Sequence, residues 1–425
     1  MTVWVLLVSM IFLLLIGLPV AFGLGWSGLL ALIVQGKAPL MVFPQRLWTS
    51  IDSFPMLAIV FFVIAGELMM QGGISKRLVN FVMVFFGRLR GALAIVSVFS
   101  CALFGALSGS ALATTAAIGG IMYPEMTQEK NGYGEVFTAT LQAVGGTLGT
   151  MIPPSITLIL YANITNASIG NLFLAVVIPG IIMTLMYCLA AYYYILKRGY
   201  DKSTAARPKI NLAKSFLEGI WALLMPLIIL GGIYGGIFTP TESAIVACIY
   251  AIIVGKFIYR ELTLKTFYHA LVRSAVVSAT IMLLCATANF FGWVMAVLNI
   301  PALIMTFLQS VMNSRVVFLL VINVLFLICG MFMDTSVIVL LVIPLVYKVA
   351  AGFDISLIHF GVIACINLSM GMITPPFGTS LFVASNMTRQ RIEPMYKEVL
   401  PYCLTGIIGI LLVTFIEPLS MFLMP

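Results

Sequence analysis

The chain has 425 residues, of which 62% are hydrophobic and only 8% are charged, and its formal net charge is +8. Ordinary soluble domains carry about 25% charged residues, so this composition excludes that class. Apolar runs that could cross roughly 30 Å of hydrocarbon recur from end to end, which predicts an all-α polytopic membrane protein in a lipid bilayer. The basic residues lie between these runs, a pattern of membrane topology and not of nucleic-acid binding.

The first apolar segments predict two short helices, or one bent helix, at 3–16 and 17–34. Gly17 and Pro19 lie between the two parts and interrupt a regular helix. A longer span is predicted at 54–70, which is long enough to cross the membrane.

Capping residues precede this span, and basic residues follow it. Asp52 or Ser53 can cap the helix, while Pro55 occupies its first turn. Four basic residues then follow with no acid among them, and they predict a cytoplasmic loop: Lys76, Arg77, Arg88 and Arg90.

Two irregular apolar segments come next. Residues 91–122 suit a re-entrant hairpin better than one crossing, because two arms of about fifteen residues flank a centre rich in glycine and serine. Such backbone is tolerated at membrane depth only where it is buried in protein or lines a cavity. A span at 136–162 follows, and the Pro153-Pro154 pair breaks it because proline removes backbone donors.

The same pattern recurs in the second half of the chain. Pro153 and Pro375 are 222 residues apart, as are Pro179 and Pro401. This register divides the chain into two repeats, 1–212 and 213–425. We therefore expect two copies of one fold, each with a hairpin and a broken helix.

The second repeat is expected to have the opposite orientation in the membrane. Basic residues at 197–214 mark a cytoplasmic loop, and five crossings precede it if 3–34 forms two helices. An odd number of crossings inverts the second repeat and leaves both termini in the periplasm. Its segments are spans at 216–237, 239–255 and 274–298, a hairpin at 316–347, and a broken helix at 356–385, with basic cytoplasmic loops at 256–273 and 386–397.

Inverted repeats with hairpins and broken helices are the architecture of secondary transporters. The N-terminal ends of half-helices suit anions, whereas exposed carbonyls and hydroxyls suit Na⁺. Two cation sites are predicted, the first from Ser108, Ser110, Gly149, Ile152 and Pro154, and the second from Asp334, Thr335, Gly371, Ile373 and Pro376. The candidates for substrate contact are hydroxyl residues next to the breaks: Ser155, Thr374, Thr379 and Ser380. The alternative is that both breaks are packing kinks held by neighbouring helices.

Acidic residues within apolar segments give the sharpest hypotheses. A carboxylate at membrane depth costs about 2.5–3.5 kcal/mol on insertion scales, so Asp334 is a candidate cation ligand, with a hydrogen-bonding role at the hairpin tip as the alternative. Glu242 forms a capping-box pattern with Thr239, and a structural role is favoured over substrate contact. The sequence names no partner for Glu67.

No enzyme chemistry is indicated by the sequence. The two histidines, His269 in an expected loop and His359 near the entry of the second broken span, are too far apart to form a metal cluster or a nucleophilic pair. The chain has no Walker sequence or dinucleotide fingerprint, so coupling to ATP within this chain is not expected.

The motifs together resemble the large membrane subunit of tripartite ATP-independent periplasmic (TRAP) transporters. They cover nearly the whole chain: DSFP at 52–55, FFVIAGE at 61–67, FGALSGS at 104–110, GTMIPP at 149–154, TPTE at 239–242 and TPPFGTS at 374–380. The paired hairpins and broken helices are also similar to those of divalent-anion/sodium symporters.

This resemblance implies a sodium-coupled importer in the bacterial inner membrane with two or more Na⁺ sites. The substrate would be an organic acid anion, such as sialic acid or a dicarboxylate, delivered by a periplasmic binding protein. A small four-helix membrane subunit is expected as a separate chain. The hairpins and broken helices would form a transport domain that moves as an elevator against a scaffold of the other helices. The alternatives are a stand-alone sodium/anion symporter or an uncoupled pore of the same fold.

Overall fold

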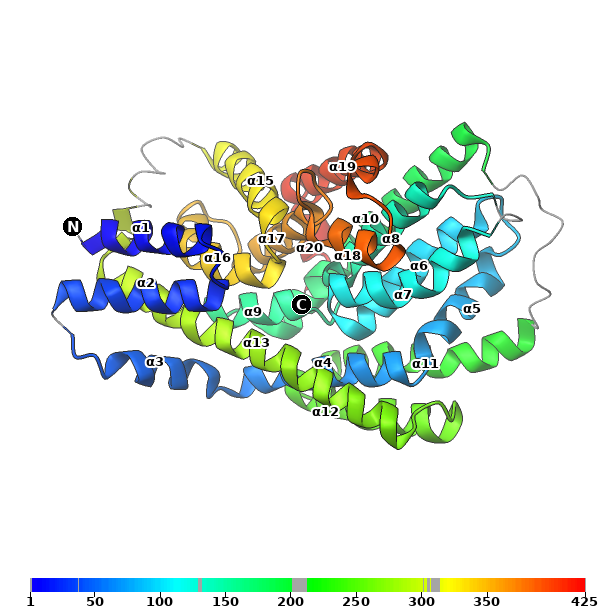
Figure 1. Ribbon diagram of the computed structural model, residues 1–425, viewed down its shortest axis with the longest axis horizontal. Helices are drawn as coiled ribbons and strands as arrows, with labels where there is room; N and C mark the ends of the chain where they lie inside the picture. Colours follow the sequence, from blue (N-terminus) through cyan, green and yellow to red (C-terminus); the bar gives the residue numbers. More distant parts are fainter. Residues whose placement is uncertain are drawn as a thin grey trace.

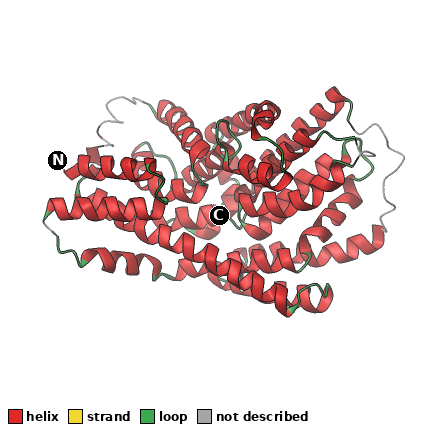
Figure 2. Ribbon diagram, in the orientation of Figure 1, coloured by secondary structure: helices red, strands yellow, loops and turns green. Residues whose placement is uncertain are grey.

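The computed structural model describes residues 2–36, 38–128, 132–200, 212–300, 302–303, 306 and 314–424. These residues form helices joined by short loops, and no strand occurs among them (Figure 2). The basic loop predicted at 197–214 falls largely on 201–211, outside the described residues.

The helices follow one another along the chain with few long connections. Those of the first half are α1 (Thr2–Leu15), α2 (Val20–Gln35), α3 (Val42–Ile51), α4 (Phe54–Gln71), α5 (Ile74–Phe86), α6 (Ala92–Ser108), α7 (Ala111–Met126), α8 (Glu135–Met151), α9 (Ile156–Thr165) and α10 (Ile169–Arg198). Those of the second half are α11 (Leu212–Tyr234), α12 (Pro240–Ile253), the π-helix η1 (Val254–Ile258), α13 (Leu264–Val297), α15 (Arg315–Phe332), α16 (Thr335–Gly352), α17 (Leu357–Gly371), α18 (Thr379–Thr388), α19 (Ile392–Phe415) and α20 (Pro418–Met421).

Among the described residues, nine helical segments are long and apolar enough to cross a membrane. The segment Glu135–Thr165, which contains α8 and α9, is the most enclosed of them, with 94% of its most apolar window buried. The other segments bury between 28% and 56% of theirs. The first broken helix therefore lies inside a multi-pass membrane protein, whereas the other long segments keep exposed faces.

The inner helices come from both halves of the chain. The arms α6 and α7 form a hairpin that packs on α8, and the arms α15 and α16 pack on α17. The second part of each broken helix packs on the other half of the chain. The helix α9 packs on α16, and α18 packs on α7 and α8. Figure 1 shows these helices in the middle of the molecule, together with α10 and α19.

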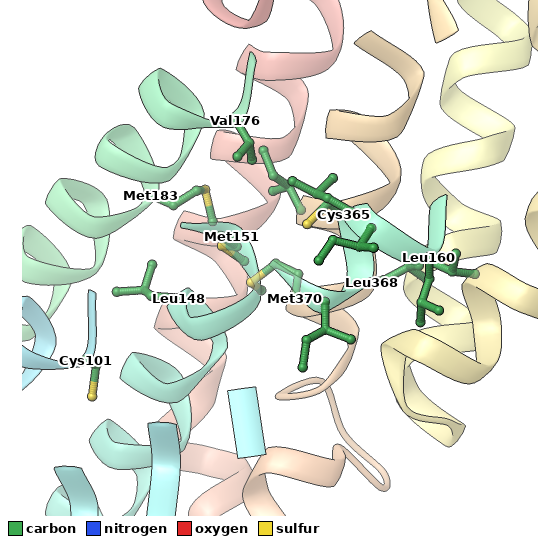
Figure 3. Close-up of a cluster of buried hydrophobic side chains, with 14 of the residues drawn as sticks. Cys101, Leu148, Met151, Leu160, Val176, Met183, Cys365, Leu368 and Met370 are labelled. Carbon is green, nitrogen blue, oxygen red and sulfur yellow. The ribbon is translucent and has the colours of Figure 1, made fainter. Parts of the chain in front are cut away.

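An apolar cluster fills the contact between the two broken helices. Leu148 and Met151 of α8 lie in it with Cys365 and Met370 of α17, and Met183 is added from α10 (Figure 3). All five side chains are fully buried or nearly so. The burial of these side chains fixes the two broken helices against each other and thereby positions both breaks.

Most of the remaining helices form an outer group along one side of the molecule in Figure 1, whereas α20 lies near the middle, against α10. Here α4 packs between α12 and α13, α13 also contacts α2 and α3, and α11 packs on α5. Large apolar side chains are exposed on this group, for example Trp4, Trp48 and Leu264. Such a surface is suited to lipid or to another membrane chain.

The structure corrects the basic loop that was predicted after residue 70. The residues after 70 form a helix, α5, and not only a basic loop. Ile74, Leu78 and Val82 are buried at helical spacing, and they hold this helix against α11 and α6. The basic residues dominated the sequence pattern and concealed this short amphipathic period.

Two smaller expectations were also wrong. His269 lies within α13 and not in a loop, because that helix begins at Leu264 under a cap from Thr263. Ser53 occupies the N-cap position of α4, but its side chain makes no capping bond, although Pro55 does lie in the first turn as predicted. The N-terminal segment forms two separate helices, with Gly17 at φ +83° between them.

Candidate functional site

Each hairpin tip is hydrogen-bonded to the break in a broken helix. In the first half, the Ile156 amide donates to the Gly109 carbonyl at 3.3 Å. In the second half, the Gly378 amide donates to the Met331 carbonyl at 3.0 Å. We call these places the first junction, where the α6–α7 tip meets residues 152–155, and the second junction, where the α15–α16 tip meets residues 372–378.

Oxygen atoms gather at the first junction. The Ser108 hydroxyl lies 2.9 Å from the Thr114 hydroxyl and 3.4 Å from the Ser110 carbonyl oxygen. A Cβ atom on Gly149 would lie 2.5 Å from that Ser110 oxygen and still nearer to the Thr114 hydroxyl. Glycine at this position therefore lets the Ser110 carbonyl and the Thr114 hydroxyl pack directly against the backbone of α8, which gathers three oxygens at one place.

Pro154 and Ile152 lie differently with respect to the oxygens at the first junction. The Pro154 carbonyl oxygen borders the hairpin tip, since a Cβ on Gly109 would lie 2.8 Å from it. The Ile152 side chain faces the other way, toward Gly180 of α10. The structure thus brings together Ser108, Ser110, Gly149 and Pro154 of the predicted set and turns the Ile152 side chain elsewhere.

The second junction is built around two glycines and one carboxylate. A Cβ on Gly330 would lie 2.8 Å from the Cα of Gly371, so the hairpin and the broken helix touch through their backbones. Asp334 caps α16, and its Oδ1 accepts from the Ser336 amide at 2.9 Å. The hydrogen-bonding role at the hairpin tip is therefore present, and the half-buried carboxylate also places its charge there.

The other predicted residues of the second site have partners of their own. The Thr335 hydroxyl lies 3.1 Å from the Thr157 hydroxyl of α9. The Pro376 carbonyl accepts a hydrogen bond from the Tyr396 hydroxyl, and the Ile373 carbonyl is 3.9 Å from the Cys403 sulfur. Both carbonyls are thus directed toward α19.

Three of the four hydroxyls predicted to contact substrate are without a partner. The oxygens of Ser155, Thr379 and Ser380 are buried and make no hydrogen bond to any described residue. Thr374 instead donates to the Met370 carbonyl within its own turn. An unpaired buried hydroxyl costs about 1–3 kcal/mol, so three of them beside the breaks mark a place where a ligand or water belongs.

Backbone amides at the second break are less available than its hydroxyls. The Ser380 amide donates to the Met372 carbonyl at 3.0 Å, and the Gly378 amide is bonded to Met331. The free groups that the structure shows at this break are therefore side-chain hydroxyls, and anion binding at a half-helix N-terminus stays a prediction.

Hydroxyl contacts between the two halves were not foreseen from the sequence. The Thr150 hydroxyl of α8 lies 2.6 Å from the Ser369 hydroxyl of α17. Together with Thr114 and Thr157, these residues add four hydroxyls to the two junctions. Their only signal in the sequence is a polar side chain within a turn or two of a break or a hairpin tip.

Two acidic residues outside the junctions have structural partners. Glu242 accepts from the Thr239 amide at 2.7 Å and completes the capping box, as predicted. Glu67 lies 3.9 Å from Arg273, with one of its carboxylate oxygens buried and without a hydrogen bond among the described residues.

The kinds of ligand atom at the junctions indicate which metal ion they could bind. In the part of the chain that the structure describes, no group of three or more His, Cys, Asp or Glu side chains is placed to hold a metal ion. The first junction offers hydroxyl and carbonyl oxygens, which hard cations prefer. Broken-helix transporters coordinate Na⁺ with such groups. The residues present therefore fit sodium.

Hairpins joined to interrupted helices at a buried centre, within a multi-pass helical protein, are an arrangement typical of membrane transporters. The comparison with known proteins gives the family. Residues 7–419 match the family described as "Tripartite ATP-independent periplasmic transporter, DctM component", and the chain belongs to this family. The resemblance drawn from the sequence motifs is thus confirmed, and the chain is a transporter permease and not an enzyme.

Relatives named for different substrates show similar sequence identity to the chain. The chain is 38% identical to the isethionate TRAP transporter permease protein DctMQ of Oleidesulfovibrio alaskensis, over 96% of the chain and 64% of that relative. It is 34% identical to the C4-dicarboxylate TRAP transporter large permease protein DctM of Rhodobacter capsulatus, over 97% and 96%. It is 35% identical to the sialic acid TRAP transporter large permease protein SiaM of Vibrio cholerae, over 91% and 90%.

A solved structure shares the fold. The YdaH transporter of Alcanivorax borkumensis superposes with a TM-score of 0.63 at 15% identity, covering 89% of each chain. At this identity the likeness concerns the fold alone.

Proposed function

We propose that this chain is the large permease of a sodium-driven TRAP importer for an organic acid anion. The observation that carries the proposal is the first junction, where the hydroxyls of Ser108 and Thr114 and the Ser110 carbonyl gather beside Gly149. Bound sodium would supply the driving force by coupling its gradient to the closure of this site.

The second junction is proposed to hold another sodium ion through charge. Asp334 retains a carboxylate at the hairpin tip after its cap to Ser336 is made. A bound cation would stabilise the charge of this half-buried carboxylate. The contact between Gly330 and Gly371 would keep this carboxylate beside the break.

The substrate is proposed to bind between the two breaks. The unpaired hydroxyls of Ser155, Thr379 and Ser380 support this placement, because each needs a hydrogen-bond partner. Isethionate, C4-dicarboxylate and sialic acid, the substrates in the names of three relatives, are all organic anions. An organic anion is therefore the class proposed for this chain.

We further propose an elevator movement between inverted repeats. The hairpins and broken helices pack together into one inner group, while α2, α3, α4, α12 and α13 pack into another. Movement of the first group against the second would carry the junctions across the membrane. The repeats at 1–212 and 213–425 would then supply equivalent outward-facing and inward-facing arrangements.

The family name implies a tripartite assembly, and we propose the same for this chain. Its partners would be a small membrane subunit and a periplasmic binding protein, and its location the bacterial inner membrane. The exposed apolar side chains on the outer helices are compatible with packing against a second membrane chain as well as lipid.

Uptake into proteoliposomes tests the proposal. The chain, with its small subunit and binding protein, should accumulate a labelled organic acid only under an inward sodium gradient. Robust uptake by the chain alone would favour a stand-alone symporter. Uptake that ignores the sodium gradient would favour an uncoupled pore of the same fold.

A further inference from the structure

A buried hydrogen bond joins the second hairpin to the second broken helix away from the hairpin tip. The side-chain nitrogen of Asn367, in α17, donates to Asn323 Oδ1, in α15, at 2.8 Å. The side-chain nitrogen of Asn323 in turn donates to the Thr414 hydroxyl of α19 at 3.1 Å. All three side chains are buried, with 4% exposure or less. We call Asn323, Asn367 and Thr414 the amide network.

The amide network is connected to the second junction through continuous helix. Asn367 stands four residues before Gly371 in α17, and Asn323 stands seven residues before Gly330 in α15. About one turn and about two turns of helix therefore separate the network from the contact between these two glycines. The arm and the broken helix are thus joined at two places, and a shift of α15 along α17 would have to break the hydrogen bond.

Apolar packing alone would not align α15 and α17 in this way. Hydrophobic contacts are non-directional, whereas a hydrogen bond requires one placement of donor and acceptor. The amide network also leaves one group unsatisfied. The Asn367 nitrogen serves both Asn323 and the Ile363 carbonyl, while its Oδ1 is buried and makes no hydrogen bond to any described residue. Since a buried acceptor without a donor lowers stability, the network is better explained by alignment than by added stability.

The first half joins its hairpin to its broken helix in the same manner but with different residues. The Ser97 hydroxyl of α6 donates to Gln142 Oε1 of α8 at 2.8 Å, and both side chains are fully buried. Gly145 stands 222 residues before Asn367, and a Cβ on it would lie 2.9 Å from the Cys101 sulfur. Each half therefore has a buried side-chain hydrogen bond between a hairpin arm and a broken helix, although the residues differ. This recurrence indicates that both junctions need the two helices aligned.

We propose that Asn323 and Asn367 are positioning residues for the cation site at the second junction. Their hydrogen bond keeps α15 at one position along α17, and α15 leads directly into the tip that carries Asp334. Loss of the bond would let the tip move relative to the break and would weaken sodium binding there. This inference rests on the proposed function, in which Asp334 binds sodium.

Sodium binding to the full-length chain in nanodiscs tests the inference. The melting temperature is measured against sodium chloride concentration, with choline chloride keeping the ionic strength constant, because a bound ion stabilises the folded state. Asn323→Leu removes the bond, and the sodium concentration needed for a given rise in melting temperature should increase by roughly threefold to tenfold. Asn367→Leu should act in the same way, and the double variant should show no larger shift than either single variant, because all three lose one bond.

A milder variant covers the case in which Asn323→Leu does not fold. Thr414→Val keeps the shape of the side chain and removes only the hydroxyl that accepts from Asn323. It should raise the sodium requirement in the same direction, by about twofold to threefold, because the bond between the two asparagines remains.

Two comparisons separate positioning from a general loss of stability. In a chain that already carries Asp334→Asn, Asn323→Leu should add no further sodium shift, because both changes act on one site. The control is Tyr259→Phe, which removes a bond between helices of the outer group, from the Tyr259 hydroxyl to the Glu218 carbonyl. This control should lower the melting temperature and leave the sodium requirement unchanged.

The possible failures are distinguishable. A wild-type chain that sodium does not stabilise would overturn the proposed function and this inference together. If the wild type responds to sodium, an unchanged sodium requirement in Asn323→Leu, or in Thr414→Val where Asn323→Leu does not fold, would overturn the inference alone. An equal shift in Tyr259→Phe would also overturn it, as would shifts from Asn323→Leu and Asp334→Asn that simply multiply in the double variant.

Discussion

Gly330 and Gly371 touch through their backbones, and this contact joins the second hairpin to the second broken helix. A Cβ on Gly330 would lie 2.8 Å from the Gly371 Cα. The first half has the same relationship, because a Cβ on Gly105 would lie 2.7 Å from the Gly149 Cα. Two glycines that meet in this way let the hairpin and the broken helix approach more closely than other residues permit. Each pair therefore fixes a tip beside a break.

The glycine contact predicts that Gly371→Ala is destabilising. Its new methyl group would meet the Gly330 backbone, which cannot rotate away as a side chain can. We expect a loss of about 1–3 kcal/mol, typical of overpacking, seen as a lower melting temperature in nanodiscs. Gly231→Ala is the control, because nothing lies within 4 Å of a Cβ there and alanine favours the helix α11. Equal melting temperatures for the two variants would contradict the contact.

Asp334 has a capping role and a proposed cation role, and two substitutions separate them. Asparagine caps a helix about as well as aspartate, so Asp334→Asn should fold normally. It removes the charge, and the sodium concentration for half-maximal uptake should rise by roughly tenfold, equivalent to about 1.4 kcal/mol.

Asp334→Ala is the companion to this experiment. It removes the bond to the Ser336 amide as well as the charge, so it should also lower stability by about 0.5–2 kcal/mol. An Asp334→Asn variant that transports with an unchanged sodium curve would leave Asp334 with the capping role alone.

Thr114 is expected to contribute to the first sodium site. Thr114→Val keeps the shape of the side chain and removes the hydroxyl that lies 2.9 Å from Ser108. We expect the sodium concentration for half-maximal uptake to rise by a few-fold to tenfold. Thr140→Val is a matched control, since the Thr140 hydroxyl bonds only within its own helix, to the Val136 carbonyl. A comparable shift in both variants would argue against a local role for Thr114.

Both breaks could be located from the sequence, because a proline pair excludes a regular helix. Pro153 and Pro375 each begin a pair that no regular helix accommodates, and the repeat spacing identified the two as equivalents. Thr114 and Ser369 could not be found in this way, because their contacts depend on how separate helices pack. The helix α5 was missed although its apolar residues recur at helical spacing, because the interpretation of this segment rested on its basic residues.

Reporter fusions test the proposed inversion of the repeats. A fusion at Ile169, at the start of α10, should report the periplasm, and one at Arg207 should report the cytoplasm. The basic residues near Arg207 are the physical reason, since such loops are retained on the cytoplasmic side. The opposite result at either position would contradict the prediction of five crossings in the first repeat, and therefore the inversion of the second repeat.

The pair Thr150 and Ser369 should couple the two halves energetically. Their hydroxyl oxygens lie 2.6 Å apart, while Thr150 also contacts the Thr147 carbonyl and Ser369 the Cys365 carbonyl. Removal of either hydroxyl breaks the contact between the two halves, while the remaining hydroxyl can still donate to the carbonyl in its own helix. Thr150→Val and Ser369→Ala should each lower the unfolding free energy. The double variant should lose less than the sum, with a coupling of about 0.5–1.5 kcal/mol. The measurement is a double-mutant cycle on unfolding, and strictly additive losses would show that this hydroxyl pair does not couple the two broken helices.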